Sequence, residues 1–517
     1  MVQDDLIVAA KGSGIVFFGR VFAWGSRFGM AVLIARTLGA AEYGLYNLAI
    51  AGATIVSAFS IVGLDAALVR YSAVFAGRRD WAGLRGAMHL AIGGPALLAM
   101  ALALAVVALS EPIAGLLFRE PALGPLIRLA GILIPALILN QLLAAVLQGL
   151  KRIQWAVIAE QFVQQLLRFA FIMVFLLFGL SAYDAMLATA LAAVGVTIVL
   201  GIFVVRALPG GTFRARARLE PREMLGFSFP VWLSNVVNTL GANLQTTMLG
   251  ALATASAVGI FTIANQVTLL GSMFHIAIVA ASMPLFAGLH DRGDTAGLER
   301  LYRTTSKWTL AANLPLFIIL IAFSEQILSI FGPEFRTGSA ALGIMAWASL
   351  VNAATGTSGA ILDMTGHTRL KLLNSGVAVA LGVGLNFFLI PPFGLNGAAI
   401  AAVAAIGTVN VMRLVEVGII LHVGPYDRSF LKPITAGVAA FAASFAVKAA
   451  IDAPAGVEAA IGAAAIVASY AAVTIRLGLT ADDRMIVNRA WGRFRRTGPA
   501  RSPASADEPL GTAKAKG

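Results

Sequence analysis

Long apolar segments, separated by short polar or Gly- and Pro-containing turns, constrain this chain more than any other feature of its sequence. A helix needs about 20 mainly apolar residues to cross a membrane, and about fourteen segments of this kind follow one another. Of the 517 residues, 59% are hydrophobic and 12% are charged, whereas a soluble domain is about half apolar and a quarter charged. We therefore predict an all-α polytopic membrane protein with about fourteen transmembrane helices, near residues 12–35, 45–64, 88–109, 124–147, 155–178, 184–205, 225–249, 257–288, 304–324, 339–362, 370–390, 396–421, 430–451 and 456–476.

The placement of lysine and arginine predicts how the chain is oriented. If the N-terminus is cytoplasmic, 29 of the 38 Lys and Arg residues lie in segments on that side. We therefore predict a multi-pass protein of the cytoplasmic (inner) membrane with both termini in the cytoplasm. The net charge of +13 indicates this topology and an attraction to anionic lipid rather than nucleic-acid binding.

Short sequence matches indicate an internal repeat. "YGLYNLA" at 43–49 resembles "VGIFTIA" at 258–264. Two further pairs, 108–118 with 322–332 and 144–149 with 359–364, are separated by the same offset to within one position. This shared offset carries helices 1 to 6 onto helices 7 to 12, which predicts two six-helix lobes related by a pseudo-twofold axis along the membrane normal.

The repeat also predicts the division of the chain. Two helices fall outside it, an arginine-rich segment joins its two copies, and a basic stretch precedes a Pro/Ala/Ser-rich end that should be disordered. The predicted divisions are an N-lobe at 1–206, a basic cytoplasmic linker at 207–223, a C-lobe at 224–422, helices 13 and 14 at 423–477, and a cytoplasmic tail at 478–517.

Several stretches in this order resemble a transporter family. They are "RTLGAAEYGLYNLA", "GLDAALVRYSA" at 63–73 and "LGFSFPVWLSN" at 225–235. Together with the helix count, they resemble the polysaccharide-transporter, or Wzx-type flippase, branch of the multidrug/oligosaccharidyl-lipid/polysaccharide exporter superfamily. The resemblance covers roughly residues 10–475 and implies a flippase with a cationic central cavity. Family members often carry an acidic residue near the end of helix 7, where this chain has Gln245.

Arginine within the apolar runs is the feature with the clearest chemical meaning. Arg20 and Arg27 are seven residues apart, so they lie on nearly the same face of the first helix and roughly 10 Å apart along it. An arginine at mid-bilayer costs about 2.5–3.5 kcal/mol. One interpretation is that the pair binds an anionic headgroup through planar guanidinium groups. The other is that one or both reach the interface or pair with a carboxylate on another helix.

Helix 5 carries a second polar stripe. Glu160, Gln164 and Arg168 recur every four residues and therefore share one side of a regular helix. Arg168 lies deeper and is predicted to face Arg20 and Arg27 across the N-lobe. Glu160 lies nearer the cytoplasmic start, where it either takes part in gating or is interfacial.

Other polar residues allow two interpretations each. Asp65 and Arg70 resemble a family motif at the end of helix 2, so they form either a gate that opens as the lobes move or an ordinary interfacial anchor. Asn235 and Asn238 in helix 7 either bind sugar hydroxyls or hold helices together. His275, Arg413 and Glu416 are interpreted as packing features rather than ligands.

We predict a secondary transporter, not an enzyme: a flippase that moves a polyprenyl-diphosphate-linked oligosaccharide across the cytoplasmic membrane by alternating access. The chain has no P-loop, nucleophile elbow or H-E-x-x-H motif and no cysteine, so no catalytic residue, cofactor or metal is expected. Two alternatives remain: a drug or cation antiporter of the same superfamily, and a membrane glycosyltransferase or polymerase of the same pathway. The expected partners of this monomer are the lipid-linked oligosaccharide and membrane lipids, with polysaccharide polymerase and export machinery as an open alternative and no nucleic acid.

Overall fold

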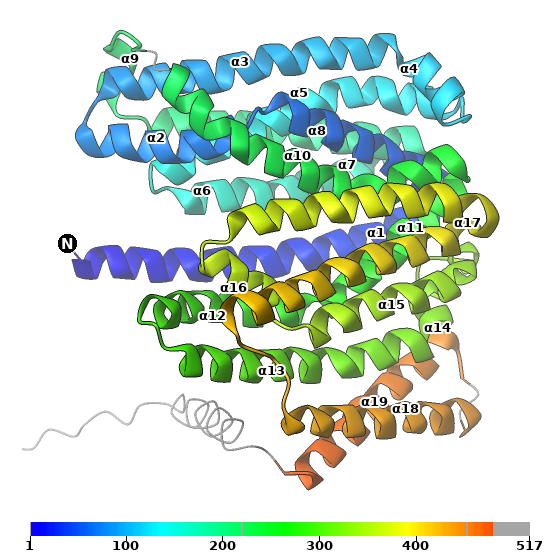
Figure 1. Cartoon of the computed structure of the whole chain (residues 1–517). Helices are drawn as coiled ribbons and strands as arrows, with labels where there is room; N and C mark the ends of the chain where they lie inside the picture. The colour runs from blue at the N-terminus through cyan, green and yellow to red at the C-terminus, as the bar shows by residue number, and fades with distance from the viewer. Residues whose placement is uncertain (1, 219–220, 451–452, 479–517) are drawn as a thin grey trace, which may run out of the picture.

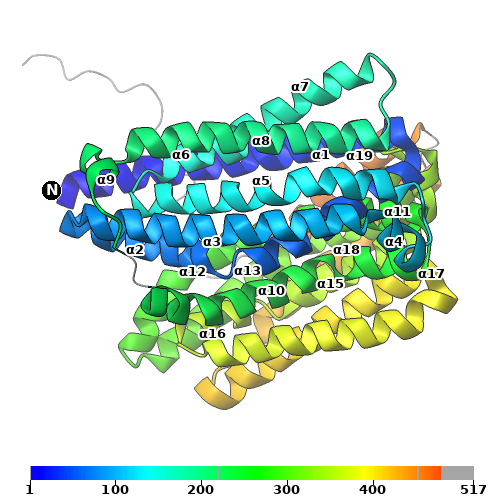
Figure 2. The same ribbon diagram turned by 90° about the horizontal axis from the view of Figure 1, so that it is seen from above.

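The chain folds into a bundle of helices that run alongside one another (Figures 1 and 2). The computed structural model describes residues 2–218, 221–450 and 453–478; the side chains of residues 2–18, 20, 21 and 368 lie outside this description. Every regular element in the described residues is helical, as expected where lipid leaves each backbone N–H and C=O to find a partner within the protein. The predicted basic stretch and disordered end of the tail, from residue 479 on, lie outside the described residues.

The first half of the chain contains four helices of more than 25 residues and several shorter ones. They are α1 (Val2–Ser60), α2 (Leu64–Arg78), α3 (Trp81–Ala108), α4 (Ser110–Pro112), η1 (Ile113–Leu117), α5 (Leu123–Gly149), α6 (Ile153–Val157), η2 (Ile158–Val163), α7 (Gln164–Leu176), α8 (Ala182–Ala207) and α9 (Gly210–Arg214).

The second half continues the bundle and ends in a helix pair. Its elements are α10 (Pro221–Leu252), α11 (Ala255–Gly271), α12 (Met273–Asp291), α13 (Thr295–Ala322), α14 (Ser324–Ser329), η3 (Pro333–Gly338), α15 (Ser339–Ala354), α16 (Ser358–Met364), α17 (Thr368–Leu421), η4 (Arg428–Phe430), α18 (Leu431–Ala450) and α19 (Ala455–Arg476).

Ten helices in the described ranges are long and apolar enough to cross a membrane, or eleven with one bent pair. Two of them each hold two predicted spans, because α1 and α17 continue through backbone kinks at Gly39 and Gly394. Helix α10 is not among the ten, because asparagine and glutamine in its second half lower its hydropathy. The multi-pass all-α fold is confirmed, and the number fourteen stays a prediction.

Matching turns recur at the spacing that the sequence repeat predicts. The Asp80 carboxylate caps α3 by accepting from the Gly83 N–H at 2.9 Å, and Asp294 caps α13 by accepting from the Gly297 N–H at 2.8 Å. Gly179 and Gly394, separated by the offset of the repeat, both have positive φ, of 92° and 53°. The same backbone conformations therefore return in the second half, and the residue limits of the lobes stay predictions.

The two halves meet at a crossing of small residues between α1 and α11. A Cβ added to Gly44 would collide with the carbonyl oxygen of Ala255, and one added to Gly259 would collide with that of Ala40. Ala40 corresponds to Ala255 in the repeat and Gly44 corresponds to Gly259, so the contact is self-complementary. Small residues let helix backbones approach this closely in membranes.

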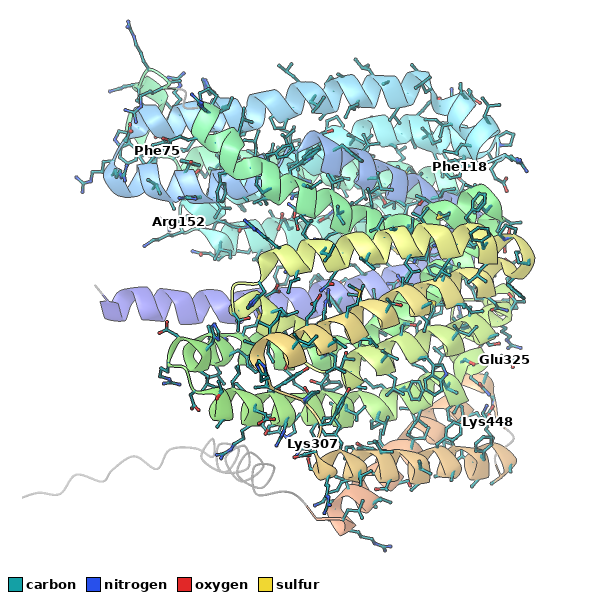
Figure 3. All side chains as sticks on the ribbon, viewed as in Figure 1. Phe75, Phe118, Arg152, Lys307, Glu325 and Lys448 are labelled. Carbon is teal, nitrogen blue, oxygen red and sulfur yellow. The ribbon has the colours of Figure 1, made fainter. Side chains whose placement is uncertain are left out.

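The halves also meet at the other end of the bundle. Gly63 has a φ of 69°, and a Cβ there would collide with the carbonyl oxygen of Ser228 on α10. Phe75 and Arg152 lie toward this end, which also carries the N-terminus, whereas Phe118, Glu325 and Lys448 lie toward the opposite end (Figure 3). Of these residues, Arg152 was predicted on the inside and Lys448 on the outside, and the two lie toward opposite ends of the bundle.

Candidate functional site

Three charged residues from distant parts of the chain lie within electrostatic range of one another in the first half. Arg27 on α1 interacts electrostatically with both Glu160 on η2 and Arg168 on α7. We call these three residues the arginine cluster. Its net charge is positive, because it combines two guanidinium groups with a single carboxyl group. Arg20 lies seven residues earlier in α1, and its side chain lies outside the described part of the chain.

The helix that carries Glu160 is not a regular α-helix there. Residues Ile158–Val163 form a π-helix between α6 and α7, which widens the turn and changes the direction of the side chains. The regular every-four-residue spacing predicted for this stripe is therefore wrong at Glu160. The wide turn packs against α1, where the Phe22 and Phe162 rings stack with centroids 4.9 Å apart.

Arg168 is held by a chain of hydrogen bonds. It donates to the Tyr46 hydroxyl, which lies 2.9 Å from the Thr189 hydroxyl. Thr189 in turn bonds to the Ala185 carbonyl oxygen at 2.9 Å. Because arginine only donates, the Tyr46 oxygen accepts from Arg168 and its single proton goes to Thr189. The Nε of Arg168 is buried and has no partner among the described residues.

Tyr46 was not among the predicted site residues, although the sequence contains a signal for it. It belongs to "YGLYNLA", and its counterpart in the second copy of the repeat is Phe261. Only the first copy of the repeat therefore carries the hydroxyl that holds an arginine. A comparison of the two copies for polar residues present in one alone would have found it.

Arg27 lies where α1 contacts the second half of the chain. Its side chain is exposed. Gln266 on α11 donates to the Arg27 carbonyl oxygen at 3.4 Å. The arginine cluster thus lies beside the contact between the halves.

The predicted pair Asp65 and Arg70 is not an ion pair in the described structure. Asp65 accepts a hydrogen bond from Gln141 at 2.9 Å, and Arg70 lies over the ring of Phe227 on α10, 4.8 Å from its centroid. The two residues lie in the same short helix, α2, and point to different neighbours. Arg70 is the one of the two that contacts the second half.

Helix α10 carries the predicted amides. Asn238 is exposed and accepts a hydrogen bond from Ser375 on α17 at 3.3 Å, whereas Asn235 is half-buried. Neither is joined to the arginine cluster by a hydrogen bond among the described residues. The part of α10 that carries Asn235 and Asn238 is therefore polar and uncharged at these two positions.

Two family models match the chain. The model described as "Polysaccharide biosynthesis protein" matches residues 9–290, and the MatE model matches residues 230–410. The first match covers more than half of the chain, including every member of the arginine cluster.

Relatives with given roles are distant. The chain is 25% identical over 223 residues to the teichuronic acid biosynthesis protein TuaB of Bacillus subtilis, covering 42% of this chain and 46% of that protein. It is 25% identical over 184 residues to the probable low-salt glycan biosynthesis flippase Agl15 of Haloferax volcanii, covering 35% and 39%. The chain therefore spans less than half of the length of these relatives.

Solved structures share the fold. The lipid II flippase MurJ in an inward closed conformation has a TM-score of 0.72 at 15% identity, over 90% of this chain and 98% of that one. An inward-facing multidrug resistance MATE family transporter has a TM-score of 0.62 at 17% identity, over 76% and 94%. At such identities the likeness concerns the fold alone. The order of motifs, the shared fold and the family match over residues 9–290 lead to one conclusion: the chain belongs to the polysaccharide biosynthesis protein family.

Proposed function

We propose that this chain is a flippase that moves a polyprenyl-diphosphate-linked oligosaccharide across the cytoplasmic membrane by alternating access, without covalent chemistry. The observation that carries the proposal is the arginine cluster, where the exposed Arg27 lies within electrostatic range of Arg168 and of a single carboxyl group. The family match and the glycan biosynthesis names of the relatives support the same class of substrate.

The arginine cluster suits a diphosphate. Two guanidinium groups offer planar pairs of donors to phosphate oxygens, which gives stronger and more oriented hydrogen bonds than neutral donors do. The hydrogen-bond chain through Tyr46 fixes Arg168, while its buried Nε keeps a donor without a partner among the described residues. In this proposal Arg20, Arg27 and Arg168 hold the diphosphate, and Glu160 limits the net charge so that the substrate can leave.

The uncharged amides provide for the sugars. Asn235 and Asn238 present donors and acceptors that fit hydroxyl groups of many glycans, so they hold the oligosaccharide without selecting one sugar. The prenyl chain stays in lipid. Asp65 and Arg70 act in gating, and Arg70 does so through its contact with Phe227, because that contact joins the two halves.

The proposal is tested in liposomes that contain the purified protein and a polyprenyl-diphosphate disaccharide with a fluorescent label. We expect label to become accessible to an external quencher in the presence of the protein, and Arg27→Ala with Arg168→Ala to stop this transfer at unchanged protein content. Transfer by the double variant at the normal rate would overturn the diphosphate role.

A drug or cation antiporter is the second candidate, because the MatE model matches residues 230–410. A cationic substrate would be repelled by the net positive arginine cluster. Transport of a cationic dye by the same liposomes, without transfer of the lipid-linked sugar, would favour this candidate instead.

A further inference from the structure

A second polar site lies inside the other half of the chain. A cavity of about 260 Å³ opens among α12, α15, α16 and α17, near the turn from α16 into α17. We call it the chamber; its lining includes His275, Asn352, Asp363, Lys371, Asn374 and Arg413. The packing role predicted for His275 and Arg413 does not describe their position, because both side chains border open volume.

The carboxylates at the chamber already have partners. Lys371 Nζ pairs with Asp363 Oδ2 at 2.9 Å, and Asn374 Nδ2 donates to Glu416 Oε2 at 2.8 Å. Arg413 is attracted by both acids. It makes no hydrogen bond or salt bridge to any described residue. One guanidinium therefore borders the chamber near two acids, without a hydrogen bond to a described residue.

Two other polar atoms at the chamber also lack partners among the described residues. They are Oδ1 of Asn374, whose side chain is fully buried, and Nδ1 of His275. A buried polar atom without a hydrogen bond costs about 1–3 kcal/mol, and an arginine inside a membrane domain costs about as much again. Such a group of atoms indicates a place for a polar ligand.

The first copy of the repeat lacks the polar residues that line the chamber. The counterparts of Lys371, Asn374 and Arg413 in the first copy of the repeat are Ala156, Ala159 and Ile198, and both alanines are buried in the core. The polar residues are therefore specific to the second half rather than a requirement of the shared scaffold.

We infer that the chamber binds the carboxylate of an acidic sugar in the transported glycan, so that the substrate is an acidic saccharide. The inference rests on the proposed function and deepens it. A planar guanidinium pairs with a carboxylate through two parallel hydrogen bonds, and the neighbouring amides of Asn352 and Asn374 suit ring hydroxyls. Lys371 offsets Asp363, and Glu416 lies within electrostatic range of Arg413, so little excess positive charge remains, which favours a monoanion over a phosphate. The chamber is smaller than the roughly 300–1,000 Å³ of a drug-sized pocket, which fits one sugar ring.

The test measures thermal unfolding of the purified full-length protein with three probes: glucuronate, glucose and acetate. Glucose has the ring without the carboxylate, and acetate has the carboxylate without the ring. We expect glucuronate, at several times its Kd, to raise the melting temperature by ~2 °C and the other two to raise it less. An equal shift with acetate would mean that any free anion binds, and an equal shift with glucose would mean that the charge is not recognised; either overturns the inference.

Variants locate the binding. Arg413→Gln removes the shift with glucuronate, whereas Arg369→Gln, a loss of the same charge on the same helix outside the chamber, keeps it. If Arg413→Gln does not fold, Asn352→Asp adds a like charge to the lining at the same size and should also remove the shift. A shift that survives in the folded variant at the chamber would overturn the inference.

The experiments distinguish a wrong inference about the chamber from a wrong proposal that the protein is a flippase. Arg27→Gln should keep the shift with glucuronate and lose transfer of the lipid-linked sugar. Transfer without any glucuronate shift in the unmodified protein means that the protein flips lipid-linked sugars and the chamber is not its acidic subsite. A glucuronate shift without transfer means that the chamber binds acidic sugars and the flippase role is wrong.

Discussion

The arginine cluster and the chamber both contain arginine, but its side chain has different partners in the two places. In the cluster, Arg168 is tied to Tyr46 and Arg27 lies beside Glu160. In the chamber, the acids are tied to Lys371 and Asn374, and Arg413 is left without a partner among the described residues. The cluster thus fixes Arg168 through a hydroxyl group, whereas in the chamber the acids have the partners and our proposal assigns Arg413 to a ligand.

The difference shows how a duplicated scaffold acquires two sites. The capping turns and glycine kinks repeat at nearly constant spacing, so the backbone is shared. Polar residues do not repeat: Tyr46 corresponds to Phe261, and Arg413 corresponds to Ile198. Function is thus expected to lie where the two copies differ in side chains and agree in backbone.

The strongest test of the comparison removes both cations of the cluster. We expect Arg27→Ala with Arg168→Ala to lower the rate of lipid transfer by about 10²-fold or more, because each hydrogen bond to a charged group contributes about 1.5–3 kcal/mol and the variant removes both guanidinium groups. The liposome quenching assay measures it. Arg128→Ala is the matched control, since Arg128 pairs with Glu111 at the surface.

Lysine at both positions separates charge from shape. It should restore part of the rate, because an ammonium keeps the charge and loses the planar fork. Full transfer by the double alanine variant would show that transfer does not need the arginine cluster, and Arg413 in the chamber would then be the cation to test.

A second test disturbs the contact between the two halves at the crossing of α1 and α11. Gly44→Leu should destabilise the protein by about 1–3 kcal/mol, because the new side chain meets the Ala255 carbonyl in a packed crossing. Thermal unfolding in detergent measures the change. Gly52→Leu on the same helix is the control, since a Cβ there meets no atom within 4 Å; equal effects at the two glycines would contradict the importance of the crossing.

A third test releases Arg168 without removing it. Tyr46→Phe deletes the acceptor and should cost about 1–3 kcal/mol of stability, together with a several-fold slower transfer. Tyr71→Phe is the control, because no hydrogen bond of its hydroxyl occurs among the described residues. Unchanged transfer in Tyr46→Phe would show that the cluster does not need a fixed arginine.

The smallest effect is expected at Arg70. Arg70→Gln loses a cation over the Phe227 ring, worth about 0.5–1 kcal/mol at an exposed site, so transfer should fall by less than about fivefold. Asp65→Asn tests the other residue of the proposed gate, because it removes the charge of the side chain that accepts a hydrogen bond from Gln141 and leaves Arg70 unchanged. Equal and large losses of transfer in both variants would indicate that Asp65 and Arg70 form the predicted ion pair in another conformation.

Much of the fold could be predicted because hydropathy and the repeat are properties of the sequence alone. Apolar length predicted the multi-pass bundle, and the mid-membrane cost of Arg27 and Arg168 predicted that they would lie near other polar groups. The π-helix at Ile158–Val163 could not be predicted, because one extra residue in a turn leaves no mark on an apolar pattern. The chamber was missed for a different reason: His275, Asp363, Lys371 and Arg413 come from three helices, and only the folded chain brings them together.

The crossing of Ala40 and Gly44 with Ala255 and Gly259 has a consequence for how such a chain can change over time. Each glycine faces the backbone of the other copy, so neither can gain a side chain unless the partner helix moves away. Substitutions at the two positions are therefore coupled, because each of the two helices limits the size of the residue that the other can carry at the crossing. Where the two sites were free to diverge in their side chains, this crossing had to stay alike in both copies.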